Sequence, residues 1–187
     1  MSTTPTLHFQ LSFPEPQTHY VEISINIKNW GHPDFIDLKM PVWAPGSYLV
    51  REYSKNVERL HVVTDGNNKI PVEKINKNTW RIYHNGQDIN VHYAVYAFES
   101  SVRTSFIDHS RAFLSPVGIF MYADGFLDLP ASIEIKSPAH WSTISTGLPM
   151  KESNAIYYAE NFDILYDSPF EIGNQDTWKF DVDGVLH

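Results

Sequence analysis

Nine histidines are the first residues in this sequence whose chemistry calls for a test, because imidazole is the commonest metal ligand in proteins. A helical zinc site needs two histidines four positions apart with a glutamate beside the first, and no His-Glu-x-x-His stretch occurs. His84 and His92 lie on separate segments with no obvious third ligand. We therefore expect these histidines to be packed or solvated, and we expect no cofactor or metal site in this chain.

Nucleophilic side chains also lack the context that activates them. The absence of cysteine excludes a thiol nucleophile, a thiolate zinc site and a disulfide framework. There is no Gly-x-Ser-x-Gly elbow, no Ser-x-x-Lys motif and no glycine-rich phosphate loop. The stretch APGSY contains a serine after a glycine and nothing more. By itself, the chain is not expected to be an enzyme.

Carboxylates are the remaining catalytic option. A glycosidase-like pair could be drawn from Asp108, Asp124 and Asp128, but the sequence does not set the separation of two carboxyl groups. Charged residues near turns are usually solvated. A self-contained hydrolase is therefore the least favoured alternative.

Charge and hydropathy limit the classes of partner that the chain is expected to bind and the compartment in which it is expected to lie. The net charge is -8, the isoelectric point is near 5.5 and no block of basic residues is present, which argues against nucleic acid and anionic membranes as partners. The start MSTTPTLHFQLSF does not have the pattern of a signal peptide, and no stretch approaches the roughly 18 apolar residues of a membrane span. We expect a cytoplasmic protein.

Alternation of apolar and polar residues dominates the chain and predicts strands with one buried face. The stretch LHFQLSF, residues 7–13, places leucine or phenylalanine at every odd position, and YVEISINIK, residues 20–28, has valine or isoleucine at every odd position from 21. About ten strands are predicted in all by turn spacing, and the alternation recurs over residues 35–42, 57–63, 79–83, 89–98, 133–136 and 178–182.

The arrangement of these strands follows from their patterns. Residues 89–98, INVHYAVYAF, are apolar on both faces, which predicts a central strand. The best helical candidate is NFDILYDS, where Asn161 can cap one or two turns ahead of Pro169. No linker or repeat is visible. The sequence predicts one all-β domain over residues 1–187, an antiparallel β-sandwich of two layers.

The connection PVWAPGSYLVREYS, residues 41–54, is too long and too aromatic for a simple turn between strands. Such an insertion is typical of a shaped loop with a function. Pro45 and Gly46 suit the two central positions of a type II turn, where glycine tolerates positive φ.

Three ordered stretches carry a family resemblance: PVWAPGSYLVREYSKNVERL, then the segment from NTWRIY to FMYADG, then DSPFEIGNQDTWKFDVDGVLH. They resemble the N-terminal domain of the glycyl aminopeptidase family of zinc metallopeptidases, bacterial gluzincins that also carry a PDZ domain. The resemblance runs from about Phe9 to His187. Leu186 departs from the pattern, because relatives commonly have proline at this place.

The resemblance implies an architecture that the residue patterns do not show. In this family an all-β domain, similar to the saddle-shaped domain of larger aminopeptidases, precedes a thermolysin-like catalytic domain that holds His-Glu-x-x-His and a downstream glutamate. The catalytic and PDZ domains are absent from this chain. Zinc is therefore expected in the missing catalytic domain, and the implied partners are that domain of the same polypeptide and a peptide substrate.

The resemblance also suggests a role for the loop. Trp43, Pro45, Gly46, Tyr48 and Arg51 would form a rigid ledge that packs on the catalytic domain or borders its substrate cleft, with the arginine available to a carboxylate or to carbonyl groups. The alternative is that the loop closes one end of this domain's own core, with the arginine paired to an internal acid.

An aminopeptidase must also bind the α-ammonium group of its substrate, which calls for carboxylates in the cleft. Glu171 in SPFEIG and Asp108 in SFIDHSR are candidates, and Tyr122 in GIFMYADG is a weaker candidate for the cleft edge. The alternative for each acid is a solvated or locally capping role.

The sequence as a whole favours a noncatalytic N-terminal domain of a zinc aminopeptidase that packs on the catalytic domain and shapes substrate access. The rival interpretation is a free-standing peptide- or carbohydrate-binding β-sandwich module, based on the 14% aromatic content.

Overall fold

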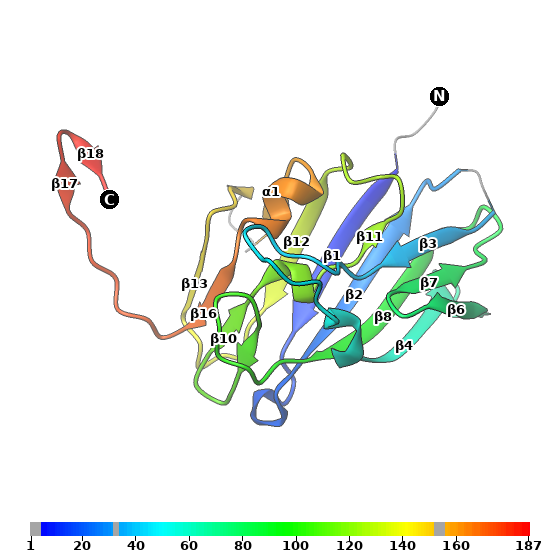
Figure 1. The fold of residues 1–187 in the computed structure, drawn as a ribbon, viewed down its shortest axis with the longest axis horizontal. Coiled ribbons are helices and arrows are strands. Elements are labelled where there is room, and N and C mark those ends of the chain that lie inside the picture. Colours follow the sequence, from blue (N-terminus) through cyan, green and yellow to red (C-terminus); the bar gives the residue numbers. More distant parts are fainter. Residues whose placement is uncertain (1–4, 32–33, 152–155) are drawn as a thin grey trace.

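The computed structural model of the 187-residue chain describes residues 5–31, 34–151 and 156–187. Its main element is a sheet that we call the large sheet (Figure 1). In spatial order, its described strands are β14 (Met150–Lys151), β15 (Ile156–Ala159), β12 (Ala131–Lys136), β1 (Thr6–Ser12), β2 (Tyr20–Lys28), β8 (Ile89–Tyr96), β4 (Val57–Thr64) and β5 (Lys69–Ile70).

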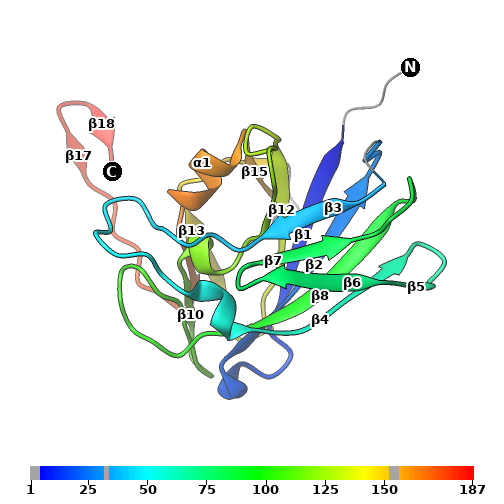
Figure 2. The same ribbon diagram turned by 45° about the vertical axis from the view of Figure 1, so that its right-hand side comes forward.

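Two smaller sheets lie over one face of the large sheet, together with the short helix α1 (Phe162–Tyr166), as Figures 1 and 2 show. The β10 sheet consists of β13 (Thr143–Thr146), β16 (Phe170–Gly173), β10 (Ala112–Leu114) and β9 (Phe106–Ile107). The β7 sheet consists of β11 (Tyr122–Ala123), β3 (Ile36–Lys39), β7 (Thr79–Ile82) and β6 (Val72–Asn76).

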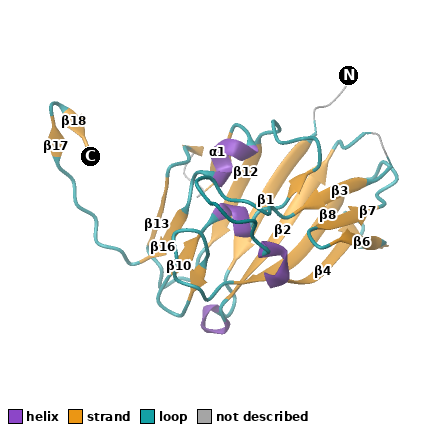
Figure 3. Cartoon of the chain, in the orientation of Figure 1, coloured by secondary structure: helices purple, strands orange, loops and turns teal. Residues whose placement is uncertain are grey.

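Helical structure is sparse in the described residues (Figure 3). Besides α1 there are three 3-10 turns: η1 (Pro16–Thr18), η2 (Tyr53–Asn56) and η3 (Pro116–Gly118). The prediction of a helix capped by Asn161 is confirmed, because its side-chain oxygen accepts a hydrogen bond of 2.9 Å from the Ile164 N–H.

The core lies between the large sheet and the elements that cover it. The odd-numbered apolar residues of β1 and β2 are buried, as their alternation predicts. Phe9 packs edge-on against Phe120 and Phe162, at ring-centroid distances of 5.1 and 6.2 Å. All three side chains are fully buried, and burying one such side chain is worth roughly 1.5–3 kcal/mol.

The predicted central position of β8 is confirmed, since it pairs with β2 on one side and β4 on the other. Only its inner face is fully buried, however. On the other face, which we call the outer face of the large sheet, His92 is half-buried and Tyr96 is exposed. Both side chains have an apolar body and a polar tip, so they tolerate partial contact with water.

Three details differ from the sequence prediction. The pairing is antiparallel as predicted, except that β1 and β12 run parallel. The described residues form eighteen strands rather than about ten, because a strand of two residues carries no readable alternation. Of the strand predicted over residues 178–182, only β17 (Asp181–Val182) forms.

The C-terminal segment leaves the body after β16 and ends in a small hairpin of β17 and β18 (Val185–Leu186), as Figure 1 shows. Asp183 and Gly184 connect the two strands, with φ values of 51° and 80°. Positive φ at both central residues is the geometry of a type I′ hairpin turn, which Asp-Gly favours.

Candidate functional site

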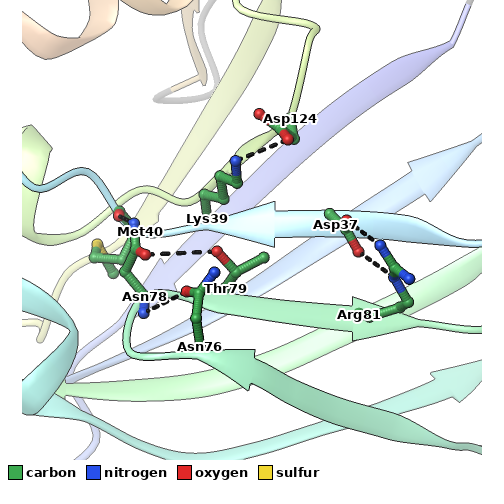
Figure 4. A network of polar contacts seen from close by, with 8 residues as sticks. All are labelled: Asp37, Lys39, Met40, Asn76, Asn78, Thr79, Arg81 and Asp124. Atoms are coloured by element: carbon green, nitrogen blue, oxygen red, sulfur yellow. Dashed lines mark hydrogen bonds and ion pairs between the residues drawn. The ribbon is translucent and has the colours of Figure 1, made fainter.

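The loop at residues 41–52 is anchored at its start by the β7 sheet (Figure 4). The Met40 N–H donates to the Asn78 carbonyl at 2.9 Å, and the Asn78 side-chain amide donates back to the Met40 carbonyl at 2.8 Å. Beside it, Lys39 forms an ion pair with Asp124 at 2.7 Å. These contacts fix the point at which the loop begins.

A two-bond ion pair holds β3 against β7 in the same network (Figure 4). The Arg81 Nε and Nη2 atoms donate to the two Asp37 carboxylate oxygens at 2.8 and 2.7 Å. These hydrogen bonds raise the pKa of Arg81 above its ordinary value. A planar guanidinium on a carboxylate fixes the relative position of the two strands.

The loop is folded on itself. The Ser47 N–H donates to the Ala44 carbonyl at 3.0 Å and Gly46 has a φ of 72°, which confirms a turn with glycine at its third position. The Trp43 indole N–H donates to the Ser47 carbonyl at 2.7 Å. The Arg51 N–H closes the loop on the Val42 carbonyl, so the loop has a defined shape without helix or strand.

The side chains of this loop are unusually exposed. Trp43 is 51% exposed, Tyr48 is 101% exposed, and Leu49 and Val50 are 62% and 78% exposed. The alternative that Trp43 and Tyr48 close the core of this domain is therefore wrong for both side chains. An apolar surface of this kind is typical of an interaction site.

The surroundings of Arg51 also differ from those of the alternative, in which it is paired to an acid inside this domain. Its Nε atom is buried and has no hydrogen-bond partner, and no acid in the described part of the chain forms an ion pair with its guanidinium. Tyr53, which follows it, is buried and donates its hydroxyl to the Arg103 carbonyl at 3.1 Å. Burial raises the pKa of Tyr53, although the Arg51 charge opposes this effect.

Asp108 and Glu171 lie on either side of one arginine. The Asp108 carboxylate accepts hydrogen bonds from the Ser110 N–H and hydroxyl and from the Arg111 N–H. Burial opposes ionisation of Asp108, but these hydrogen bonds together outweigh it and the pKa lies below its ordinary value. Glu171 forms an ion pair of 3.0 Å with Arg111 Nη1.

Both acids thus have the local partners that the alternative interpretation describes. Glu171 borders a hollow of about 510 Å³ beside the β10 sheet, whereas Asp108 does not line it. Its lining comprises His109, Ser110, Arg111, His140, Glu171, Asn174 and Gln175.

Tyr122 lies apart from both groups, on β11. Its ring is half-buried and contacts the rings of Phe162 and Tyr166, each at 6.4 Å between centroids. Burial raises the pKa of Tyr122. The carboxylate of the nearby Asp124, one of the acids considered for a catalytic pair, forms its ion pair with Lys39.

The structure thus brings Trp43, Tyr48 and Arg51 together in one loop, places Asp108 and Glu171 around Arg111, and leaves Tyr122 elsewhere. Arg111 was not singled out from the sequence, since an isolated arginine carries no signal of what it will bridge.

The described residues contain neither a metal-binding cluster of three side chains nor a membrane-spanning helix. Within residues 5–31, 34–151 and 156–187, no three histidine, aspartate or glutamate side chains are grouped so that they could hold a metal ion. His84 is fully buried, and its Nδ1 accepts a hydrogen bond of 3.1 Å from the Gly86 N–H, as expected of a packed histidine. No helix among the described residues is long and apolar enough to cross a membrane.

Comparisons with known proteins bear on the family and the fold of the chain. A family model described as the peptidase M61 N-terminal domain matches residues 8–174. The structure of an aminopeptidase N family protein from Idiomarina loihiensis superposes with a TM-score of 0.90 and 29% identity, covering 97% of this chain and 32% of that chain. A search of curated protein sequences finds no match.

More distant structures share the fold alone. A variant of an M1 zinc metallopeptidase from Deinococcus radiodurans has a TM-score of 0.51 at 11% identity, over 90% of this chain and 42% of that chain. Another structure of an M1 zinc metallopeptidase variant from Deinococcus radiodurans, bound to a Tyr-Ser-Ala substrate, has a TM-score of 0.50 at 10% identity, over 97% and 46% of the two chains. The chain thus spans about a third of the Idiomarina protein.

Proposed function

The chain belongs to the peptidase M61 N-terminal domain family, and from this premise we propose that it is the noncatalytic N-terminal domain of a zinc-dependent glycyl aminopeptidase. In this role it packs on the catalytic domain of the same polypeptide and shapes the access of peptide substrates.

The exposed apolar loop is the observation that carries the proposal. The body of the domain buries most of its large apolar side chains, including Phe9, Phe120 and Phe162. The loop at residues 42–50 instead presents tryptophan, tyrosine, leucine and valine to water. A domain that lies against another domain would cover these side chains.

The C-terminal segment supports the same proposal. Trp178 is 83% exposed and Phe180 is 60% exposed, and the hairpin that follows carries three more exposed apolar residues, namely Val182, Val185 and Leu186. This segment stands away from the body (Figure 1). An isolated two-stranded hairpin is at best marginally stable in water, so contact with a second domain would stabilise it.

The similar proteins support the enzymatic part. The Idiomarina protein is described as an aminopeptidase N family protein, and this chain corresponds to about a third of its length. We assign the zinc to the catalytic domain, where it would polarise the scissile carbonyl and activate water. No group of three ligating side chains that could hold it is found in the part of the chain that the structure describes.

Within this proposal, Arg51 and Tyr48 border the substrate cleft. Arg51 has no acidic partner among the described residues, and Tyr48 of the same loop is fully exposed. A planar guanidinium suits a carboxylate or the carbonyl groups of a peptide, and a rigid aromatic ring offers it an apolar contact.

The test begins with the gene. We expect the reading frame to continue beyond the codon for His187 into a His-Glu-x-x-His motif with a downstream glutamate. The encoded protein and the 187-residue chain are then compared by hydrogen exchange. Slower exchange of residues 42–51 and 176–187 in the longer protein supports packing on the catalytic domain.

A stop codon, or equal exchange in both proteins, contradicts the proposal and favours the free-standing peptide- or carbohydrate-binding module. The role in substrate access is tested by Arg51→Ala in the full-length enzyme. We expect a changed KM with an unchanged Tm, and a loss of stability without a change in KM contradicts the role at the cleft.

A further inference from the structure

The edge of β8 loses its neighbour at the point where β4 begins. Val57, the first residue of β4, lies opposite Val95, and the residues before it form the η2 turn instead of a longer strand (β4 and β8 in Figure 2). On the other edge the pairing continues, because Phe98 forms a β-bridge with Phe106. Beyond Val95, the chain is thus paired along one edge only.

Phe98 directs its backbone groups toward the unpaired edge. The Ala97 carbonyl accepts from the Ile107 N–H at 2.8 Å, on the paired edge. The Glu99 N–H donates to the Ser105 carbonyl at 3.2 Å, on the same edge. Successive residues of a strand direct their backbone groups to opposite edges, so the Phe98 N–H and C=O face the other way. Within the described residues, neither group has a hydrogen-bond partner.

A hollow of about 310 Å³, which we call the edge hollow, lies along this edge. Five consecutive residues, 95–99, line it together with Lys55 and Asn56 of the η2 turn. The side chains of residues 95–99 alternate between the two faces of the strand. The edge hollow therefore follows the edge of the strand and does not lie on one face of the sheet.

The polar groups of the edge hollow also lack partners. The Asn56 side-chain amide, which can both donate and accept, forms no hydrogen bond with the described residues. Lys55 and Glu99 carry opposite charges, and neither forms an ion pair in the described part of the chain. Tyr96 and Phe98 are 38% and 48% exposed. These groups suit a peptide, which has amide groups, two oppositely charged termini and apolar side chains.

We propose that the edge hollow binds a short peptide with free termini, which adds a strand to the large sheet at Phe98. One residue of the peptide accepts from the Phe98 N–H and donates to the Phe98 C=O, the two hydrogen bonds that paired residues of antiparallel strands exchange. Recognition through the backbone does not depend on the sequence of the peptide. The site is independent of the proposed function, because its residues all belong to this chain and lie outside the loop at residues 41–52.

The experiment is a titration of the ¹⁵N-labelled 187-residue chain with trialanine, followed by NMR of the amide groups. We expect saturable shifts of the Phe98 N–H and of the Asn56 side-chain amide. Sedimentation velocity on the same samples tests whether a second copy of the chain occupies the edge instead.

Phe98→Pro and Phe98→Ala form a matched pair of variants. Both remove the ring, but only proline removes the N–H. Because no described group accepts from this N–H, proline costs no internal hydrogen bond at this edge position. Phe98→Pro should bind trialanine at least about tenfold more weakly than Phe98→Ala does, since the peptide carbonyl loses its donor.

Asn56→Ala is the further variant, in case Phe98→Pro does not fold, and it should also bind trialanine more weakly than the parent chain. The proposal is overturned if trialanine leaves the Phe98 N–H resonance in place, or if the shift follows dimerisation of the chain rather than the trialanine concentration. It is equally overturned if folded Phe98→Pro binds as Phe98→Ala does, or if Asn56→Ala binds as the parent chain does.

Discussion

The core around Phe9 and the loop at residues 41–52 are both rich in apolar side chains, but the core is closed to water and the loop faces it. Phe9, Phe120, Phe162 and Phe170 are fully buried. Tyr48, by contrast, is 101% exposed. The difference shows that this domain buries one apolar surface by itself and leaves another exposed, which is the surface that the proposed function assigns to a partner.

The two regions also differ in how they are held. The core residues lie on strands whose alternation turns every second side chain inward. The loop is held by hydrogen bonds within itself and by the anchor at Met40, so its side chains contribute little to the folding of the body. Under the proposed function, stability and interaction are thus carried by separate residues.

The largest expected effect is in the core. Phe162→Ala should lower the free energy of unfolding by about 3–5 kcal/mol, because it leaves a cavity beside Phe9. Urea unfolding measures the loss. Ile164→Ala on the same helix is the control, and since Ile164 is 46% exposed, a much smaller loss is expected. Equal losses in the two variants would contradict the assignment of Phe162 to the core.

An intermediate effect is expected at the ion pair of the β7 sheet. Asp37→Ala should lower the free energy of unfolding by less than the core variant does, because it removes two charge-assisted hydrogen bonds from Arg81. Lys77→Ala is the control, since its ion pair with Glu52 lies in water and should contribute nothing measurable by urea unfolding. If Asp37→Ala leaves the free energy of unfolding unchanged, this ion pair does not stabilise the sheet.

A smaller effect is expected from protonation of His92. Its folded-state pKa lies below the ordinary value of 6.5, so the unfolded chain takes up the proton first as the pH falls. This contribution to stability is present above pH 6.5 and is lost as the pH falls toward the folded pKa. His92→Gln should therefore lose less stability than the parent chain between about pH 7.5 and about pH 5. Identical pH dependence of urea unfolding in the two proteins would contradict this.

The smallest effect on stability is expected at the C-terminal segment. Deletion of residues 176–187 should change Tm by less than about 2 °C, because the segment makes no part of the core. Sedimentation velocity should show less self-association, since exposed apolar residues are removed. A large fall in Tm would show that the body depends on the segment.

Local features of the fold were readable from the residues. Three predictions are confirmed: the alternation in β1 and β2, the cap at Asn161 and the turn at Gly46. They could be made from the sequence because each feature depends only on neighbouring residues. The role of the loop at residues 41–52 stays a prediction. The two-residue strands were not predicted, because they form only where another segment of the chain lies beside them.

Sequence alone therefore determined that the chain is built of half-buried strands, since the alternation of apolar and polar residues along a short segment is a local property. Only the tertiary structure decided that Trp43 and Tyr48 face water, that Arg111 joins Asp108 to Glu171, and that the edge of β8 is unpaired at Phe98. These outcomes depend on contacts between residues far apart in the chain, and such contacts follow from strand register and packing rather than from the spacing of residues.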